Sequence, residues 1–397
     1  MKNKSLIFSG ILLIGLVMYG WLHVLNLSQI FNDPLTVCRR TWEGYKRVFI
    51  TQEGRVVRPK EKDTVSEGQA YAMLRSVWMG DKETFDKCYA WAEQNLSRFN
   101  GEGDSLLAWH WKDGKVSDWM PASDADLDYA LALVFADTQW RGQSPSGLAD
   151  YGSKAKEVLA DILRLETRRS AGLRLYLLPW IMDERAAENI PLNPSYYSPG
   201  HFRVFLSFTG DARWNELIDT SYFIFEATAR KLGEEEGVGL VPDWCSVDKK
   251  NRFSPLDEKS SDFGWEAVRI PLRVALDYYW FQSSQAEEFF GTNLKHFLEP
   301  RWQEDRVLFC EYSYNGTAHK SYENALFYAA YACIFMAGKS PYAEDLVKKT
   351  RSFLRHKRGA WVYQDEDDYF TNSLAWFADG IKSGIIRNIC AKKGEGN

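Results

Sequence analysis

Apolar residues recur at intervals of three and four along most of this chain, the spacing that predicts amphipathic helices. The first clear case begins at Ser66, and the apolar positions of one face are Ala70, Met73, Leu74, Val77 and Trp78. Ser66 and Gln69 fit a capping box at the start of this helix. Glu67 therefore lies in a first helical turn, where a carboxylate either complements the helix dipole or takes part in chemistry.

The same spacing continues to the end of the chain, with turn-rich connections between the periodic segments. It predicts helices at residues 84–96, 126–140, 155–165, 199–207, 212–231, 266–281, 286–297, 322–337, 343–354 and 369–381. Two short segments that carry Val and aromatic residues, 47–50 and 360–363, are interpreted as small strands. This succession predicts an all-α fold of helical hairpins closed into a toroid, although an all-α repeat array would give the same number of helices.

The N-terminal segment is different, because lysines precede an almost uninterrupted apolar run at residues 6–25. About 20 apolar residues cross a bilayer as a helix, whereas the core of a signal peptide has about 7–15. Since no small-x-small cleavage site follows, we expect residues 1–27 to be a cytoplasmic N-terminus and an uncleaved transmembrane anchor, with the remaining chain outside. Residues 28–41 would be a short connector and residues 42–397 a single domain. A cleaved export signal is the alternative, and it exports the same domain.

The composition is that of a globular protein, since 45% of the 397 residues are hydrophobic and 26% are charged. Acidic and basic residues are interspersed and the net charge is −5. We therefore expect no nucleic-acid partner.

Motifs for metal, nucleophile or nucleotide chemistry are missing from the sequence. There is no H-E-x-x-H, G-x-S-x-G or Walker-type glycine loop, and neither the cysteines nor the histidines have ligand spacing. We expect no metal and no cofactor. The cysteines are interpreted as buried thiols, with a disulfide of unassigned pairing as the alternative in an exported domain. They are Cys38, Cys88, Cys245, Cys310, Cys333 and Cys390.

A second cluster of acids, Asp124, Asp126 and Asp128, runs directly into an apolar helical segment. Ser123 or Asp124 would serve as its N-cap. Three acids in five residues exceed what one cap needs. The alternatives are an over-capped, solvated helix start and a calcium loop, but the glycine and the terminal Glu of an EF-hand are missing.

A third acidic site precedes residue 270. Glu266 and Arg269 have the spacing of a surface ion pair on a helix, and Pro271 indicates that the regular helix begins or bends there. A fourth acid, Asp243, lies in a turn beside Trp244, where an ordinary turn Asp is the alternative.

Aromatic side chains accompany these acids, and 15% of the chain is aromatic. In a toroid whose inner helices run parallel, all their N-termini open on one face, so acids from distant parts of the chain can converge there. Carboxylates beside flat aromatic rings are typical of a groove that cleaves sugar polymers. The aromatic residues close to the acids in sequence are Trp109, Trp111, Trp119, Tyr196, Tyr197, Trp244 and Trp265.

Four motifs together resemble glycoside hydrolase family 8, in order and approximate spacing. They are Ser66-Glu67-Gly68-Gln69, the segment 122–128 with its helix ending at Trp140, Asn193-Pro194-Ser195-Tyr196, and Glu266-Ala267-x-Arg269. Within this family the chain resembles the endoglucanases that accompany bacterial cellulose synthesis, which also carry a phrase like residues 50–56. The resemblance extends from Trp42 to about Trp280 and weakens beyond it. The combination is specific, whereas any one motif alone is not.

The resemblance implies an (α/α)6 barrel and inverting cleavage of β-1,4-linked glucan, xylan or chitosan. It implies that Glu67 is the general acid and that Asp124 binds and orients the sugar, with Asp126 in support. The family's base is commonly an Asp in a Y-D-A-x-R motif, and this chain has Glu266 at that position. The base is therefore either Glu266 or Asp243. Inversion requires the two carboxyl groups to be about 6.5–9.5 Å apart, against about 5–5.5 Å for retention, and we expect the longer separation.

A general acid at neutral pH needs a raised pKa, whereas a helix N-terminus lowers the pKa of a carboxyl group. We expect burial and the like charges of Asp124 and Asp126 to raise the pKa of Glu67.

The expected substrate is a β-1,4-linked glucan or a related exopolysaccharide, including one that carries acetamido sugars. The chain would be a monomer that works beside an exopolysaccharide synthesis complex. A non-catalytic carbohydrate-binding or assembly protein on the same barrel, its base lost, is the main alternative, and an all-α scaffold whose acids are only caps is another. The residues expected to contact substrate are Gln69, Tyr71, Trp109, Trp111, Asp126, Asn193, Tyr196, Trp244 and Arg269.

Overall fold

The computed structural model describes residues 32–183 and 189–391 of the chain. The predicted anchor at residues 1–27 lies outside this part. Among the described residues, no helix is both long enough and apolar enough to cross a bilayer.

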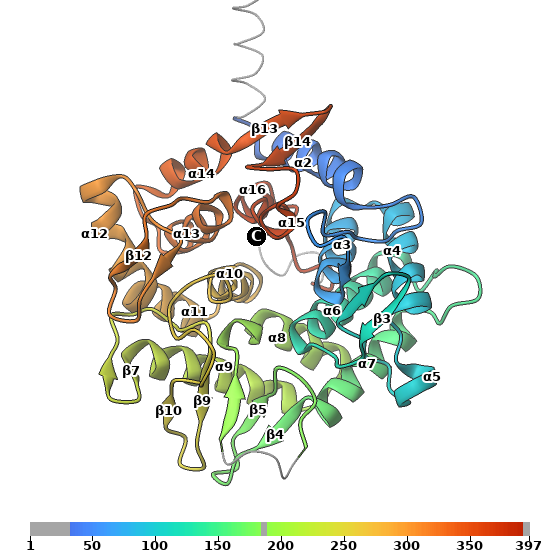
Figure 1. Ribbon diagram of the computed structural model, residues 1–397, viewed down its shortest axis with the longest axis horizontal. Helices are drawn as coiled ribbons and strands as arrows, with labels where there is room; N and C mark the ends of the chain where they lie inside the picture. The colour runs from blue at the N-terminus through green and yellow to red at the C-terminus, as the bar shows by residue number, and fades with distance from the viewer. Residues whose placement is uncertain (1–31, 184–188, 392–397) are drawn as a thin grey trace, which may run out of the picture.

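The helices form two concentric rings (Figure 1). Neighbours in the inner ring pack against each other in chain order, and the α15–α3 contact closes the ring. The inner helices are α3 (Ser66–Met79), α6 (Ser123–Trp140), α8 (Pro199–Thr209), α10 (Arg269–Phe281), α13 (Ala325–Ala337) and the short pair α15 (Tyr369–Leu374) and α16 (Phe377–Lys382). This mostly helical architecture is consistent with an (α/α)6 barrel.

Each inner helix packs against a partner in the outer ring. The outer helices are α2 (Pro34–Phe49), α4 (Lys82–Asn95), α7 (Tyr151–Leu165), α9 (Arg213–Arg230), α11 (Ser284–Phe289) with η2 (Phe290–Leu294) and α12 (Lys295–Asp305), and α14 (Ala343–Ser352). The sequence explains which ring a helix joins. Almost every side chain of α13 is apolar and buried, as expected for a helix enclosed on all sides, whereas α7 and α14 keep a polar outer face.

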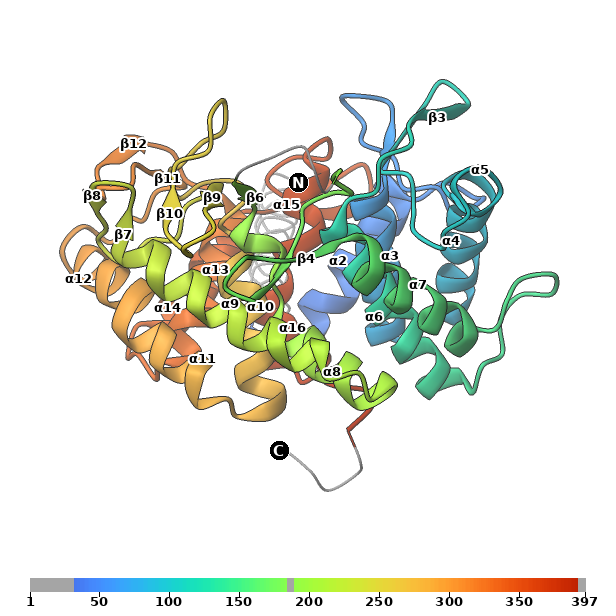
Figure 2. The ribbon, with the colours of Figure 1, turned by 90° about the horizontal axis from the view of Figure 1, so that it is seen from below.

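Short hairpins connect the helices, and most of them gather at one end of the barrel (Figure 2). Two three-stranded antiparallel sheets lie there, one formed by β1 (Thr64–Val65), β2 (His110–Lys112) and β3 (Lys115–Asp118), the other by β6 (Ile190–Leu192), β9 (Cys245–Val247) and β10 (Phe253–Ser254). The two-stranded hairpins are β4 (Thr167–Arg169) with β5 (Leu175–Leu177), β7 (Lys231–Leu232) with β8 (Glu235–Glu236), β11 (Glu311–Tyr312) with β12 (Ala318–Lys320), and β13 (Leu354–Lys357) with β14 (Ala360–Tyr363). Two single turns are α5 (Phe99–Glu102) and η1 (Pro194–Tyr196).

Several local predictions need correction. The predicted strand at 47–50 is wrong, because residues 47–49 end α2, which Asp33 caps through the Thr36 amide, and Ile50 forms only an isolated bridge with Val56. Helix α2 begins inside the stretch assigned to the connector, and its residues Val37 and Cys38 are buried. The predicted strand at 360–363 is confirmed as β14.

The predicted helix caps at the inner ring are also wrong. Neither α3 nor α6 has a side-chain cap among the described residues, and the hydroxyl groups of Ser66 and Ser123 are buried without a partner there. The prediction of free thiols is confirmed, since all six cysteines lie in the described part of the chain, form no disulfide, and are buried or, for Cys390, half-buried.

Candidate active site

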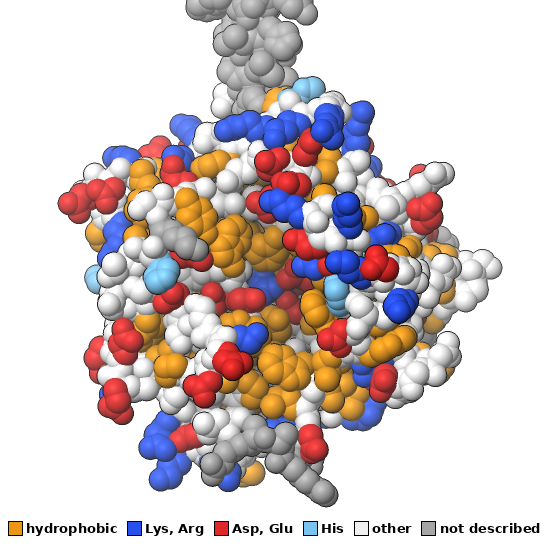
Figure 3. Space-filling view, in the orientation of Figure 1, with side chains coloured by type: hydrophobic (Ala, Val, Ile, Leu, Met, Phe, Trp, Pro, Cys, Tyr) orange, Lys and Arg blue, Asp and Glu red, His pale blue; other side chains and the backbone are white. Residues whose placement is uncertain are grey.

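A groove of about 480 Å³ opens at the end of the barrel where α3, α6 and α10 begin. Glu67 and Asp124 lie in the first turns of α3 and α6, and Glu266 lies in the turn that leads into α10. All three line the groove. Figure 3 shows acidic and basic side chains together in the hollow at the centre of this face, with apolar side chains around it.

One guanidinium group joins the three carboxylates. Nη1 of Arg269 lies 2.7 Å from Oε2 of Glu67 and 2.7 Å from Oδ2 of Asp124, and Nη2 forms an ion pair with Glu266. Its Nε donates to the hydroxyl of Ser195 at 3.2 Å. Because Arg269 is buried, its charge is weakly screened and holds acids from three segments of the chain together. Glu266 and Arg269 thus form the ion pair that their spacing predicts. It is not an ordinary surface pair, because the guanidinium of Arg269 is buried.

Glu67 has a second partner far along the chain. The hydroxyl of Tyr369, the first residue of α15, donates to Oε1 of Glu67. Gly68 leaves room for this contact, since a Cβ atom there would lie 2.9 Å from the ring of Tyr369. The sequence did not predict Tyr369 as a site residue. The one local signal for it is the preceding Asp368, which caps α15 and so marks another helix start that carries an acid.

Burial raises the pKa of Glu67, against the opposing effects of the Arg269 charge and the Tyr369 hydrogen bond. The negative charges of Glu266 and Asp128 add to the rise. The pKa of Glu67 is therefore raised, as expected, and burial is the main cause. The acids that contribute most to the rise are Glu266 and Asp128, not Asp124 and Asp126. Burial likewise raises the pKa of Asp124 to about 7, against Arg269 and with help from Glu67 and Glu266.

Glu266 is the most accessible of the three carboxylates. Its side chain is 34% exposed, compared with 19% for Glu67 and 4% for Asp124. Nδ2 of Asn193 donates to Oε2 of Glu266 at 2.9 Å, and Arg269 binds the same oxygen. A carboxylate that is held on one side and open to the groove on the other suits the activation of a water molecule.

Asp243 bonds to the backbone amide of Glu266. It is not among the described residues that line the groove. Its Oδ1 accepts hydrogen bonds from the amides of Gly264 at 3.0 Å, Glu266 at 3.1 Å and Ala267 at 2.7 Å. Burial raises its pKa to about 7, against the bond from Ala267 and with the charge of Glu266. This geometry makes Asp243 a residue that shapes the turn carrying Glu266.

The aromatic residues predicted to contact substrate divide into two groups. Trp109 and Tyr196 line the groove. Trp244 packs edge-on against Tyr196, with ring centroids 6.0 Å apart, and so supports it. Trp111 lies outside the lining formed by the described residues and packs between Trp91 and the guanidinium of Arg55.

Three other predicted contact residues lie outside the groove lining that the described residues form. The buried amide of Gln69 bonds to the backbone of Val56, Gly54 and Cys88. Asp126 is fully buried and accepts from the amide of Leu107 at 3.0 Å, and burial raises its pKa well above the usual range. Tyr71 is buried one turn below Glu67.

A second polar layer lies one helical turn below the carboxylates. Asp128, Tyr71 and Arg273 each follow a groove residue by four positions, namely Asp124, Glu67 and Arg269, and therefore lie on the same helix faces but deeper in the barrel. A cavity of about 20 Å³ lies at this second layer, with Tyr71, Asp128 and Arg273 among its lining residues.

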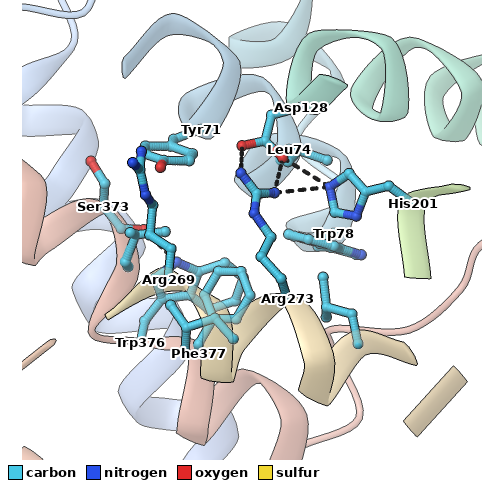
Figure 4. Close-up of a pocket in the computed structure, with 13 residues that line it drawn as sticks. Tyr71, Leu74, Trp78, Asp128, His201, Arg269, Arg273, Ser373, Trp376 and Phe377 are labelled. Carbon is cyan, nitrogen blue, oxygen red and sulfur yellow. Dashed lines mark hydrogen bonds and ion pairs between the residues drawn. The ribbon is translucent and has the colours of Figure 1, made fainter. Parts of the chain in front are cut away.

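Asp128 is the centre of this layer (Figure 4). It accepts from Nη2 of Arg273 at 2.7 Å and lies 2.8 Å from Nε2 of His201. Although burial opposes ionisation, Arg273 and His201 lower the pKa of Asp128 to about 2. Burial lowers the pKa of His201 to about 4, so the layer holds a neutral imidazole and a charged carboxylate at neutral pH. These contacts fix α6, α8 and α10 relative to one another.

The described residues contain no group of three or more His, Cys, Asp or Glu side chains placed to hold a metal ion. The chemistry that this groove can perform with its own side chains is proton transfer between carboxylates and a bound substrate.

Comparisons with known proteins show the family of this chain. The model of the family "Glycosyl hydrolases family 8" matches residues 14–384. The chain is 31% identical to Endoglucanase A of Acetivibrio thermocellus over 341 residues, which is 82% of this chain and 66% of that protein. It is also 31% identical to Endoglucanase C of Ruminiclostridium cellulolyticum over 66% of this chain and 54% of that protein. The chain thus spans between about half and two thirds of the length of these curated relatives.

Solved structures show the same fold. The endo-β-1,4-glucanase CMCax from Acetobacter xylinum superimposes with a TM-score of 0.66 at 24% identity, over 87% of this chain and 97% of that one. A β-1,3-1,4-glucanase from Paenibacillus sp. X4 gives a TM-score of 0.73 at 23% identity, over 87% and 91% of the two chains.

Proposed function

This chain belongs to glycosyl hydrolase family 8, as its four motifs predicted, and from that membership and the groove we propose that it is an endo-acting glycosidase. It cleaves a β-1,4-linked polysaccharide, either a cellulose-like β-glucan or a related exopolysaccharide, with inversion at the anomeric carbon. The observation that carries this proposal is the convergence of Glu67, Asp124 and Glu266 on the one buried guanidinium of Arg269.

Glu67 acts as the general acid. Its raised pKa keeps the carboxyl group protonated closer to neutral pH than an ordinary Glu. The proton passes to the glycosidic oxygen as the bond between that oxygen and the anomeric carbon breaks. Asp124, on the groove wall beside it, binds and orients the sugar at the cleavage point.

Glu266 acts as the general base. It takes a proton from a water molecule whose oxygen bonds to the anomeric carbon from the opposite face of the sugar ring, which inverts the configuration. Asn193 and Arg269 orient its carboxylate. Asp243 contributes indirectly, because it holds the amide of Glu266 in the turn. Trp109 and Tyr196 supply the apolar surfaces on which sugar rings lie.

We further propose that residues 42–397 act as one catalytic domain on an (α/α)6 barrel that works as a monomer outside the cell membrane. The apolar residues 6–25 and the lysines before them support an N-terminal anchor. An anchored enzyme of this kind is suited to trimming a polysaccharide that the cell exports, beside the complex that makes it.

The direct test is to incubate the full-length chain with β-1,4-glucan, mixed-linkage β-glucan, xylan, chitosan and acetamido-sugar polymers. We expect a rapid fall in viscosity of one β-1,4-linked polymer, as endo cleavage requires, and NMR should show the new reducing ends first in the inverted anomeric form. Binding to the polymers without any product would instead favour the non-catalytic carbohydrate-binding protein.

Substitutions at two residues beside Glu67 should move the pH dependence in opposite directions. In Asp124→Asn, Nη1 of Arg269 no longer divides its charge between two carboxylates, so the pKa of Glu67 should fall and the alkaline limb of kcat/KM should move to lower pH. In Tyr369→Phe, the charged form of Glu67 loses a hydrogen bond, so its pKa should rise and the limb should move to higher pH. We expect shifts of about half a unit to one unit, measured from pH–rate profiles of each variant. Shifts of the same sign would contradict the assignment of Glu67.

A further inference from the structure

An exposed apolar patch lies beside the groove. Among the described residues, six large hydrophobic side chains are exposed, and three of them belong to two segments that the hydrogen bond from Arg98 to Trp119 joins: Phe99 at 62%, Trp119 at 46% and Met120 at 41%. Isolated exposed apolar residues are common, but a cluster of them marks an interaction surface. Trp119 was also among the aromatic residues close to the acids in sequence, and the catalytic proposal does not use it.

The patch continues the wall of the groove. The amide of Trp109, which lines the groove, donates to the carbonyl of Met120 at 2.9 Å, and Ala122 of the same segment lines the groove as well. Arg98, the residue before Phe99, donates from Nη1 to the carbonyl of Trp119. In Figures 1 and 3, which share one orientation, the β3 hairpin and α5 lie on the face that carries the groove, and apolar side chains are visible between them.

The backbone under the patch is held from inside the protein. Arg98 is buried, and its guanidinium binds Asp104 at two points, with Nε 2.9 Å from Oδ1 and Nη2 2.8 Å from Oδ2. An ordered segment that presents an exposed ring loses little conformational freedom when a ligand binds. The buried ion pair therefore presents Trp119 and Phe99 as a preformed surface.

We propose that Trp119 and Phe99 form a remote sugar-binding subsite, where a pyranose ring of a long polysaccharide stacks as the chain leaves the groove beyond Trp109. The inference rests on the proposed glycosidase function. The apolar face of a sugar ring packs well on an aromatic surface, and a polymer bound in the groove would have to extend past Trp109 to reach the patch. Substrate length is therefore the variable that separates this subsite from the catalytic centre.

The test compares Trp119→Ala with the matched control Leu173→Ala, which truncates a 74% exposed side chain on the β4–β5 turn. Full-length chains are assayed on a soluble β-1,4-glucan polymer and on an oligosaccharide just long enough to be cleaved. We expect Trp119→Ala to lower kcat/KM on the polymer about three- to tenfold and to leave the oligosaccharide unaffected. Leu173→Ala should change neither value, and Trp119→Tyr should restore most of the loss. Equal effects on both substrates, or none on either, would overturn the subsite.

Binding gives a readout that does not depend on catalysis. In native gels that contain the polymer, the wild-type chain should migrate more slowly than Trp119→Ala, whereas Leu173→Ala should match the wild type. If the wild type cleaves nothing, the glycosidase function fails while this measurement still decides the subsite. A wild type that sediments as a dimer, with a monomeric Trp119→Ala that cleaves and binds the polymer normally, would assign the patch to a second copy of the chain and overturn the proposal.

Discussion

Glu67→Gln should lower kcat on the natural polysaccharide by about 10²- to 10⁴-fold, the usual contribution of a general acid. The amide cannot give up a proton at neutral pH, yet it fills the same space. Its oxygen can accept from Arg269 and its NH2 group can donate to the hydroxyl of Tyr369, which both donates and accepts. The fold should therefore persist, and rates measured with the polymer beside a thermal unfolding curve would check both expectations.

The leaving group provides a sharper control for the same variant. An aryl β-glycoside whose phenolate leaves without protonation should be cleaved by Glu67→Gln at a rate much closer to that of the wild type. Glu61→Gln is the matched substitution, because Glu61 lines the same groove but is exposed and lies outside the Arg269 contacts given for the described residues. We expect it to keep activity within about twofold. An equal loss on both kinds of substrate would remove Glu67 from the role of acid.

Helical periodicity made the convergence of Glu67, Asp124 and Glu266 predictable from the sequence. The inner helices begin where an apolar run follows a polar segment, and the parallel inner helices of a toroid open at one end. The resemblance to family 8 then assigned roles to these acids. The structure places them together as that reasoning required.

The prediction was wrong about which side chains of the inner helices point into the groove. Residues two apart on an α-helix point about 200° apart, so Gln69 faces away from the groove when Glu67 faces it, and Asp126 likewise faces away from Asp124. Residues four apart share a face, which puts Tyr71 and Asp128 directly below the acids. This geometry was available from the sequence, because the two acids fix the rotation of α3 and α6.

Other features depend on tertiary contacts that no local pattern contains. Tyr369 reaches Glu67 across 302 residues of chain, beyond the point where the family resemblance weakens. The capping box failed because the fold uses Gln69 to hold the backbone at Gly54 and Cys88 instead. The strand predicted at 47–50 failed because Phe49 packs into the core at the end of α2, and packing overrides the local preference of β-branched and aromatic residues.

The second prediction with a large expected effect concerns Glu266 as the general base. Glu266→Ala should lower kcat by about 10²- to 10⁴-fold, because no carboxylate then remains at that position to activate water. Added azide, a small anion that can enter the vacated space and needs no base, should restore turnover. It should also yield a glycosyl azide of inverted configuration, which NMR of the products identifies.

Asp243→Asn separates a base from a residue that shapes the turn. The oxygen of Asn can still accept hydrogen bonds from the amides of Gly264, Glu266 and Ala267, so the turn should survive. If Asp243 only positions Glu266, this variant should keep activity within about tenfold, since only a charge below the groove has changed. If Asp243 were the base, Asp243→Asn would instead lose about 10²- to 10⁴-fold in kcat. Azide would then rescue Asp243→Ala and would not rescue Glu266→Ala. The pair of variants thus assigns the proton acceptor from chemistry alone, because Asp243 bonds to the backbone of the turn that carries Glu266, but of the two carboxylates only that of Glu266 lines the groove.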